Sequence, residues 1–179
     1  MKALVELLAA MASKKGEVAS PLDLFLDMCD RVVKTATGMF ACKADEVAIL
    51  ILTTDTKHLR FAAPRKFSEL GTIPISKRES IAVGVFTKKA GEVMNNVPMV
   101  RHVSFFESVK LRDKPAPIQK MITAPILLAG DVVGVAQISR KGDSPAAAGP
   151  DFTAVDLRRA EGLFESVAPY LMDARPERF

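Results

Sequence analysis

The chain has 179 residues, of which 49% are hydrophobic and 26% are charged, and its formal net charge is +4. This length and composition are typical of one globular α/β or α+β domain with its own core. No apolar run reaches the roughly 20 residues that cross a bilayer, and the basic residues are scattered, which argues against a membrane protein and against a nucleic-acid groove.

The cysteines and the N-terminus indicate a cytoplasmic protein. Cys29 and Cys42 form no CxxC motif and share no ligand spacing with either histidine, so the sequence predicts neither a metal site nor a disulfide framework. Ala10-Met11-Ala12 has the shape of a signal-peptide cleavage site, but Glu6 interrupts the apolar segment that such a peptide needs.

Two helices are predicted at the start of the chain. Residues 1–14 carry an apolar stripe and end at Gly16, a common helix stop. In the second helix Ser20 supplies a cap, Pro21 suits the first position, and Asp23 completes a box-like cap. Its apolar stripe comprises Leu22, Phe25, Cys29, Val32, Ala36 and Met39. The steps of three and four in this stripe are typical of a core-facing helix or a coiled-coil seam, so Cys29 is interpreted as a core residue rather than a nucleophile.

Three strands and a helix are predicted next. Val47–Thr53 and His58–Ala63 form a hairpin about the turn at residues 55–57, and a short strand follows over Thr72–Ile75. Ser76-Lys77-Arg78-Glu79 has a capping-box pattern, which predicts a helix that ends near Gly91.

Residues 92–118 are the least regular part of the chain. A short strand over Val93–Val97 and a short helix over Phe105–Leu111 are predicted within it. Irregular spans of this kind often line a binding site.

A second hairpin is predicted at the centre of the sheet. The apolar runs Ile122–Leu128 and Val132–Ile138 are separated by Ala129-Gly130-Asp131, a hairpin signal. Gly134 and Ala136 fall on one face of the second run, where their small size predicts close packing of another element, most simply a helix.

The last element is a helix that begins at Thr153, with Asp156 at its third position. It follows a loop over Gly142–Pro150, and Pro169 is expected to kink or end it. Its apolar stripe comprises Leu157, Ala160, Phe164, Val167 and Leu171.

The order of elements predicts an α+β fold. A central antiparallel sheet of five or six strands has the N- and C-terminal helices on one face and the irregular helical span on the other.

Four segments of the chain resemble the GAF domain, a PAS-like small-molecule sensor module. They are Ala124-Pro125-Ile126, Gly130-Asp131, Val132-Val133-Gly134-Val135 and Phe152-Thr153-Ala154-Val155-Asp156. The resemblance covers residues of roughly 22–172, with residues 20–175 as the GAF-like domain and residues 1–19 as an N-terminal helical extension. It implies a small-molecule ligand and a homodimer through the terminal helices, although both helical stripes can equally pack on their own sheet.

The resemblance also sets limits on the chemistry. Lys141, Phe152 and Asp156 match part of a cyclic-nucleotide-binding signature of phosphodiesterase GAF domains, but two other positions depart from it. An ion pair between Lys141 and Asp156 is expected to be structural. Neither cysteine lies in the pocket-forming span, which argues against bilin attachment and against the thiol group of free methionine sulfoxide reductases. Haem-binding GAF domains use a histidine in the pocket, and His102 lies in the corresponding span of this chain. We favour a position on the protein surface for it.

The predicted ligand site combines a helix start with the irregular span. Ser80 and Ile81 offer free N–H groups at the start of the helix, a favourable place for an anionic group. Arg101 and His102 add polar groups, and Phe105 and Phe106 either wall the pocket or plug the sheet face.

These residues predict a sensor that binds an unidentified small molecule and acts on an effector protein in trans, with no cofactor assigned. The alternatives are a protein-interaction module with a filled pocket and a small enzyme of the free-methionine-sulfoxide-reductase type.

Overall fold

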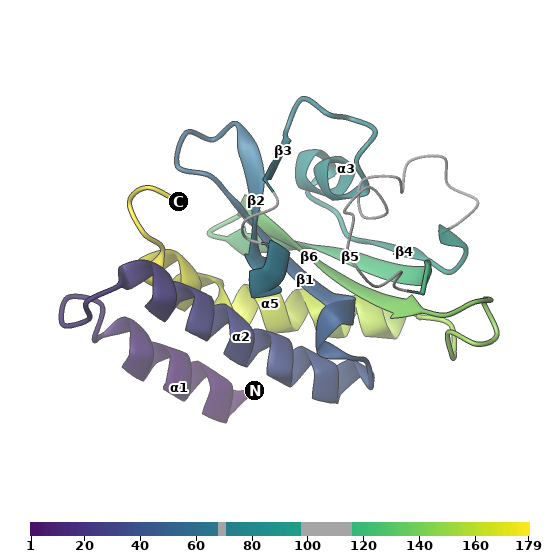
Figure 1. Cartoon of the computed structure of the whole chain (residues 1–179), viewed down its shortest axis with the longest axis horizontal. Coiled ribbons are helices and arrows are strands. Elements are labelled where there is room, and N and C mark those ends of the chain that lie inside the picture. The colour runs from purple at the N-terminus through teal and green to yellow at the C-terminus, as the bar shows by residue number, and fades with distance from the viewer. Residues whose placement is uncertain (68–70, 98–115) are drawn as a thin grey trace.

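The computed structural model of the chain describes residues 1–67, 71–97 and 116–179 (Figure 1). The helices in this part are α1 (Lys2–Ala12), α2 (Pro21–Phe40), α3 (Ile81–Lys88) and α5 (Ala154–Ala174), with one-turn helices η1 (Ala44–Glu46) and η2 (Arg65–Phe67). The strands are β1 (Val47–Leu52), β2 (His58–Ala63), β3 (Thr72–Pro74), β4 (Glu92–Met94), β5 (Ile118–Leu128) and β6 (Asp131–Lys141).

The strands of the described residues form one six-stranded sheet in the order β3-β2-β1-β6-β5-β4, and every neighbouring pair is antiparallel. This confirms the predicted α+β fold. The β5–β6 hairpin lies near its centre and turns through only two residues, Ala129 (φ 52°) and Gly130 (φ 86°). Two consecutive positive φ values are typical of a type I′ turn, whose twist matches that of the strands. Asp131 therefore opens β6, paired with Leu128, instead of lying in the turn.

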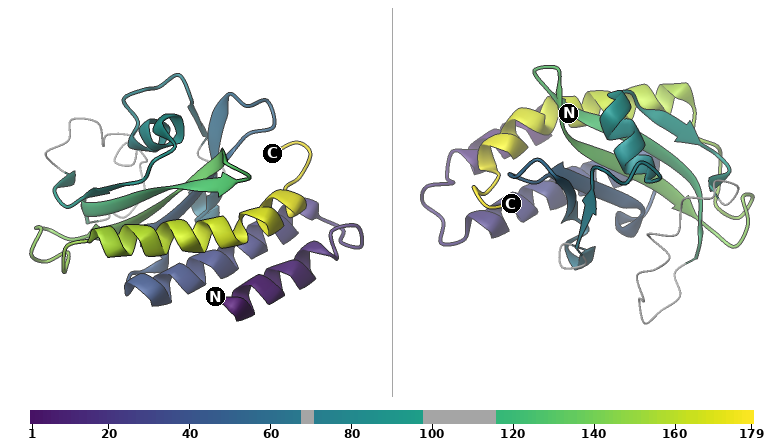
Figure 2. Two further views of the ribbon diagram at one scale, coloured as in Figure 1. Left: turned by 180° about the vertical axis from the view of Figure 1, so that it is seen from behind. Right: turned by 90° about the horizontal axis from the view of Figure 1, so that it is seen from above.

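The terminal helices α2 and α5 cover one face of the sheet, with α1 outside them, and α3 lies on the other face (Figures 1 and 2). This arrangement confirms the prediction for the terminal helices. The larger core lies between these helices and the sheet, and the smaller one lies under α3. The predicted helix over Phe105–Leu111 lies outside the described residues.

The apolar stripes of α2 and α5 are buried within a single chain. Phe25, Cys29, Val32 and Ala36 are fully buried in the larger core, as are the α5 residues Ala160, Phe164, Val167 and Leu171. The prediction that Leu22 belongs to the buried stripe of α2 is wrong, because Leu22 is 38% exposed in the first turn. Leu26, one turn later, is buried instead.

The predicted caps of the two terminal helices have different outcomes. At α5, the N–H of Thr153 donates to Asp156 Oδ2 at 2.9 Å and the N–H of Asp156 donates to Thr153 Oγ1 at 3.2 Å, so the capping box is complete. At α2, Ser20 accepts from the N–H of Asp23 at 3.2 Å, but the Asp23 carboxylate turns to Arg65 and leaves the box half-formed. Pro169 does not end α5, which continues to Ala174.

Lys141 does not pair with Asp156 as expected. Its ammonium contacts Asp45 Oδ2 at 2.9 Å, while its backbone N–H donates to Glu46 Oε1 at 2.7 Å. Burial opposes ionisation of Asp45, yet the hydrogen bond and charge of Lys141 hold its pKa below the usual value. The end of β6 is thus tied to the turn before β1, and not to the start of α5.

Gly134 is required by a neighbouring strand rather than by a helix. A Cβ built on it would lie 2.4 Å from the carbonyl oxygen of Leu50 in β1 and 3.0 Å from Ile51 Cδ1. The predicted close approach is present, but the approaching element is β1.

Candidate functional site

The predicted ligand site begins at the N-terminus of α3. The helix starts at Ile81, so the predicted capping box at Ser76 is wrong, and Ser80 is the N-cap that accepts from the N–H of Val83 at 3.5 Å. Ser80 and Ile81 are both half-buried. Arg101, His102, Phe105 and Phe106 lie outside the described residues, so the structure brings together only the first two of the six predicted residues.

A pair of polar side chains lies in the sheet on the side of α3. Along β6, Val135 packs in the core under α3 while Ala136 and Ile138 pack under α5, so the alternation of a strand directs Gln137 toward the α3 side. Gln137 faces Thr123 of β5, and its Nε2 donates to Thr123 Oγ1 at 3.5 Å. Both residues are almost completely buried, with 3% and 1% of their surfaces exposed.

Gln137 has an unused hydrogen-bonding atom. Its Oε1 is buried without a hydrogen-bond partner among the residues that the structure describes. A buried polar atom without a partner costs about 1–3 kcal/mol, so a bound donor would complete this position. The sequence contained a signal for it: Thr123 and Gln137 are polar residues inside two apolar runs that pair in the hairpin.

Apolar side chains surround much of the same face. Leu50, Phe61, Phe67 and Val83 belong to the core under α3. The rings of Phe61 and Phe67 meet edge to face, with 5.6 Å between their centroids. The described part of this face therefore combines a compact apolar cluster with one polar position.

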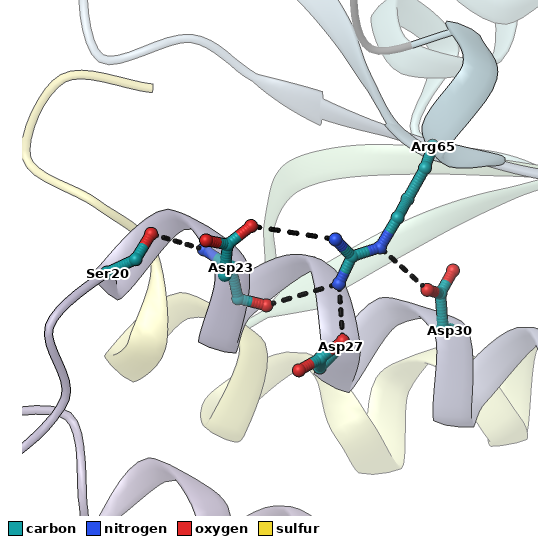
Figure 3. Close-up of polar contacts among 5 residues, drawn as sticks. All are labelled: Ser20, Asp23, Asp27, Asp30 and Arg65. Atoms are coloured by element: carbon teal, nitrogen blue, oxygen red, sulfur yellow. Dashed lines mark hydrogen bonds and ion pairs between the residues drawn. The ribbon is translucent and has the colours of Figure 1, made fainter.

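A charged cluster joins η2 to α2, on the side of the sheet away from α3 (Figure 3). Arg65 of η2 reaches three aspartates of α2: its Nε lies 2.9 Å from Asp30 Oδ2, its Nη1 lies 3.6 Å from Asp23 Oδ1, and its Nη2 contacts Asp27. The hydrogen bond to Asp30 raises the pKa of Arg65. The aspartates follow one another at steps of four and three, so they share one face of α2. Sequence reasoning missed the cluster because Arg65 is far from them in the chain.

The thiols are poorly suited to nucleophilic chemistry. Burial, reinforced by Asp30, raises the pKa of Cys29 in the α2 core. Burial, reinforced by Glu46, raises the pKa of Cys42 to about 11. Because the thiolate is the reactive form, the buried thiol of Cys29 is inert near neutral pH and the half-buried thiol of Cys42 reacts slowly. Within the described ranges, no group of three His, Cys, Asp or Glu residues can hold a metal ion, and no helix is long and apolar enough to cross a membrane.

Neither a protein-family model nor a curated protein matches the chain. Solved structures do match it. The GAF domain of an Acinetobacter phosphoenolpyruvate-protein phosphotransferase is 13% identical, with 93% of this chain and 91% of that chain covered and a TM-score of 0.64. The corresponding GAF domain from Coxiella burnetii is 11% identical, with 96% and 94% covered and a TM-score of 0.66. The chain has the GAF-domain fold.

A solved enzyme structure also matches the chain. The free methionine-R-sulfoxide reductase of Neisseria meningitidis, solved with its substrate, is 14% identical, with 94% of this chain and 87% of that chain covered and a TM-score of 0.59. At such identities the likeness concerns the fold alone. The raised pKa values of Cys29 and Cys42 disfavour thiol chemistry in this chain.

Proposed function

We propose that this chain is a regulatory GAF domain that binds a small molecule on the α3 side of its sheet and acts on a partner protein in trans in the cytoplasm. The observation that carries the proposal is the buried Oε1 of Gln137, which has no hydrogen-bond partner among the described residues. The structural neighbours include the GAF domain of a phosphotransferase and a segment of a methyl-accepting chemotaxis protein, and both support the sensor role.

The chemistry of this face defines the ligand in outline. An N–H or O–H group of the ligand donates to Gln137 Oε1, and Thr123 Oγ1 lies next to it. The apolar body of the ligand lies against the rings of Phe61 and Phe67. Ser80, Ile81, Arg101, His102, Phe105 and Phe106 complete the proposed binding residues.

The proposed homodimer uses the terminal helices through their outer surface. The stripes of α2 and α5 are already buried within one chain, so they offer little to a partner. On α1, the side turned away from the core exposes Ala3, Leu7 and Ala10, and Leu7 is 42% exposed. We therefore assign the dimer contact to this side of α1.

The test asks whether a ligand accompanies the protein and depends on Gln137. The purified chain is denatured, and released small molecules are measured by mass spectrometry for the unaltered protein, for Gln137→Met and for Ser139→Ala. Ser139 is the control because it lies two residues along the same strand, and its hydroxyl is already paired with the carbonyl of Glu46 at 3.0 Å. We expect a stoichiometric molecule that Gln137→Met loses and Ser139→Ala retains. Equal retention by both variants refutes the site.

The apolar cluster under α3 favours a second candidate, an interaction module whose ligand face is filled. Leu50, Leu59 and Val83 are completely buried there. Absence of any released molecule, together with a flat thermal-shift panel that includes cyclic nucleotides, selects this alternative.

A further inference from the structure

An open hollow of about 670 Å³ lies on the side of the sheet that α2 and α5 cover, at the β3 edge. The first turns of α2 form one wall, with Leu22, Asp23 and Leu26, and β2 and β3 form the other, with Arg60 and Thr72. Arg60 pairs with Thr72 of β3 on one side and with Ile51 of β1 on the other. The side chain of Ile51 belongs to the core under α2 and α5. The hollow therefore lies on the opposite side of the sheet from α3 and the ligand face.

Arg60 is the cation that this hollow leaves without an anionic partner. Arg65 also lines the hollow, but Asp23, Asp27 and Asp30 surround its guanidinium. In the part of the chain that the structure describes, the Arg60 side chain makes neither a hydrogen bond nor an ion pair. Its guanidinium lies over the ring of Phe179, whose centroid is 4.9 Å from Arg60 Cζ.

The contact with Phe179 prepares Arg60 for an anion. The Phe179 ring under the guanidinium provides no oxygen acceptor, so the N–H donors of Arg60 stay available for an anion. The Phe179 ring is itself held edge to face by Phe25, with 5.0 Å between centroids, and the carbonyl of Phe179 accepts from the N–H of Thr54 at 3.1 Å. A fixed ring reduces the freedom of the arginine, so less conformational entropy is lost when an anion binds.

The rest of the hollow suits an apolar group next to that anion. Leu22 is 38% exposed although it is a large aliphatic residue, and Leu26 lies one helical turn below it. The hydroxyl of Thr72, directly across from Arg60, adds a hydrogen-bond donor. The volume is within the range of small-molecule sites.

We propose that this hollow binds a carboxylate that carries an apolar body, with the carboxylate on Arg60 and Thr72 and the apolar body on Leu22 and Leu26. Two sources share this chemistry: a free aliphatic acid and the C-terminus of a peptide that ends in a leucine. The site is separate from the ligand face under α3 and does not depend on the function proposed there.

The experiment titrates the ¹⁵N-labelled chain with octanoate and, separately, with the peptide acetyl-Gly-Ala-Leu, followed by two-dimensional NMR. Octanamide and the amidated peptide are the neutral counterparts. The matched variants are Arg60→Met, which keeps an apolar stem against Phe179, and Arg78→Met, which removes an exposed arginine on the way into α3.

We expect octanoate, the free-acid peptide or both to shift the signals of Leu22, Arg60 and Thr72 and to leave Ser80 unmoved. A hydrogen bond to a charged group contributes enough that Arg60→Met is expected to weaken binding by roughly tenfold or more. Arg78→Met should bind as the unaltered chain does. Binding by only one of the two probes identifies the source and supports the proposal.

Three results overturn it. One is the absence of shifts with both probes, and another is a set of shifts centred on Ser80 and Gln137. The third is equal affinity for an acid and its neutral amide, a comparison made on the unaltered chain that does not rely on the folding of Arg60→Met.

Discussion

Replacement of Gly134 by Ala tests the account of the sheet centre most directly. The added Cβ would lie 2.4 Å from the backbone oxygen of Leu50, well inside the 3.0 Å below which Cβ atoms essentially never lie. Ile51 Cδ1 and Ile126 Cδ1, at 3.0 and 3.3 Å, crowd it further. β1 and β5 flank Gly134 on both sides, so β6 cannot move away from one strand without pressing on the other.

The magnitude follows from two opposing terms. Overpacking of a core typically costs 1–3 kcal/mol of stability. We take the upper value, about 3 kcal/mol, because the clash is with backbone in the middle of a sheet. The lower chain entropy of Ala in the unfolded state offsets about 0.4–1 kcal/mol of this. We therefore expect a net loss of about 2 kcal/mol, which lowers the Tm of a domain of this size by about 4–8 °C.

Thermal unfolding followed by circular dichroism measures this loss, with Gly162→Ala as the control. Gly162 lies within α5, and an added Cβ there meets no atom within 4 Å. Ala is favoured over Gly in a helix by about 1 kcal/mol, so the control should raise Tm by about 2–4 °C. A Gly134→Ala protein that melts with or above the unaltered chain, while the control behaves as expected, would refute the packing argument.

Three further predictions concern charges and thiols. Thr153→Ala should lower the free energy of unfolding by about 1 kcal/mol at pH 7, because it removes the α5 cap. The N–H and hydroxyl of Thr153 hold the pKa of Asp156 below its unfolded value. The variant removes only the hydroxyl's bond to that carboxylate, so this part of the loss is present above about pH 4 and disappears as the pH falls further. The loss of the acceptor for the N–H of Asp156 persists at every pH, and urea titrations at several pH values separate the two parts. Arg65→Met should destabilise by about 1 kcal/mol or less at low salt, through repulsion among the three aspartates of α2, and 1 M NaCl should remove most of the difference. At pH 7, Ellman's reagent should leave Cys29 unmodified until unfolding and should modify Cys42 slowly; rapid modification of either thiol contradicts its burial.

The fold was predictable because its signals are local. The turn between β5 and β6 and the capping pair Thr153–Asp156 each specify an element within a few residues, and the apolar runs specify a buried sheet. The predictions went wrong where a partner distant in the chain decides the outcome. Asp23 turns from its cap to Arg65, Lys141 pairs with Asp45, and no spacing rule links either pair.

The candidate site was less predictable for the same reason. Ser80 and Ile81 were predicted from the start of a helix, whereas Gln137 is a single polar residue inside an otherwise apolar run. Its importance comes from burial opposite Thr123 and from an acceptor without a partner, which only the paired strands reveal. Arg60 likewise stands out only because its guanidinium lies over the ring of Phe179, at the far end of the chain.

β2 provides a physical link between the two proposed sites. Phe61 packs in the core under α3, and Arg60, its neighbour in the chain, lines the hollow on the other side of the sheet. Successive side chains of a strand point to opposite faces, so a ligand against Phe61 and a carboxylate on Arg60 would each bear on the same peptide unit. A shift of β2 that improves one contact necessarily moves the other, and the two occupants would then change each other's affinity by the same factor. If binding of octanoate leaves the affinity for the α3-side ligand unchanged, β2 is rigid and the two sites act independently.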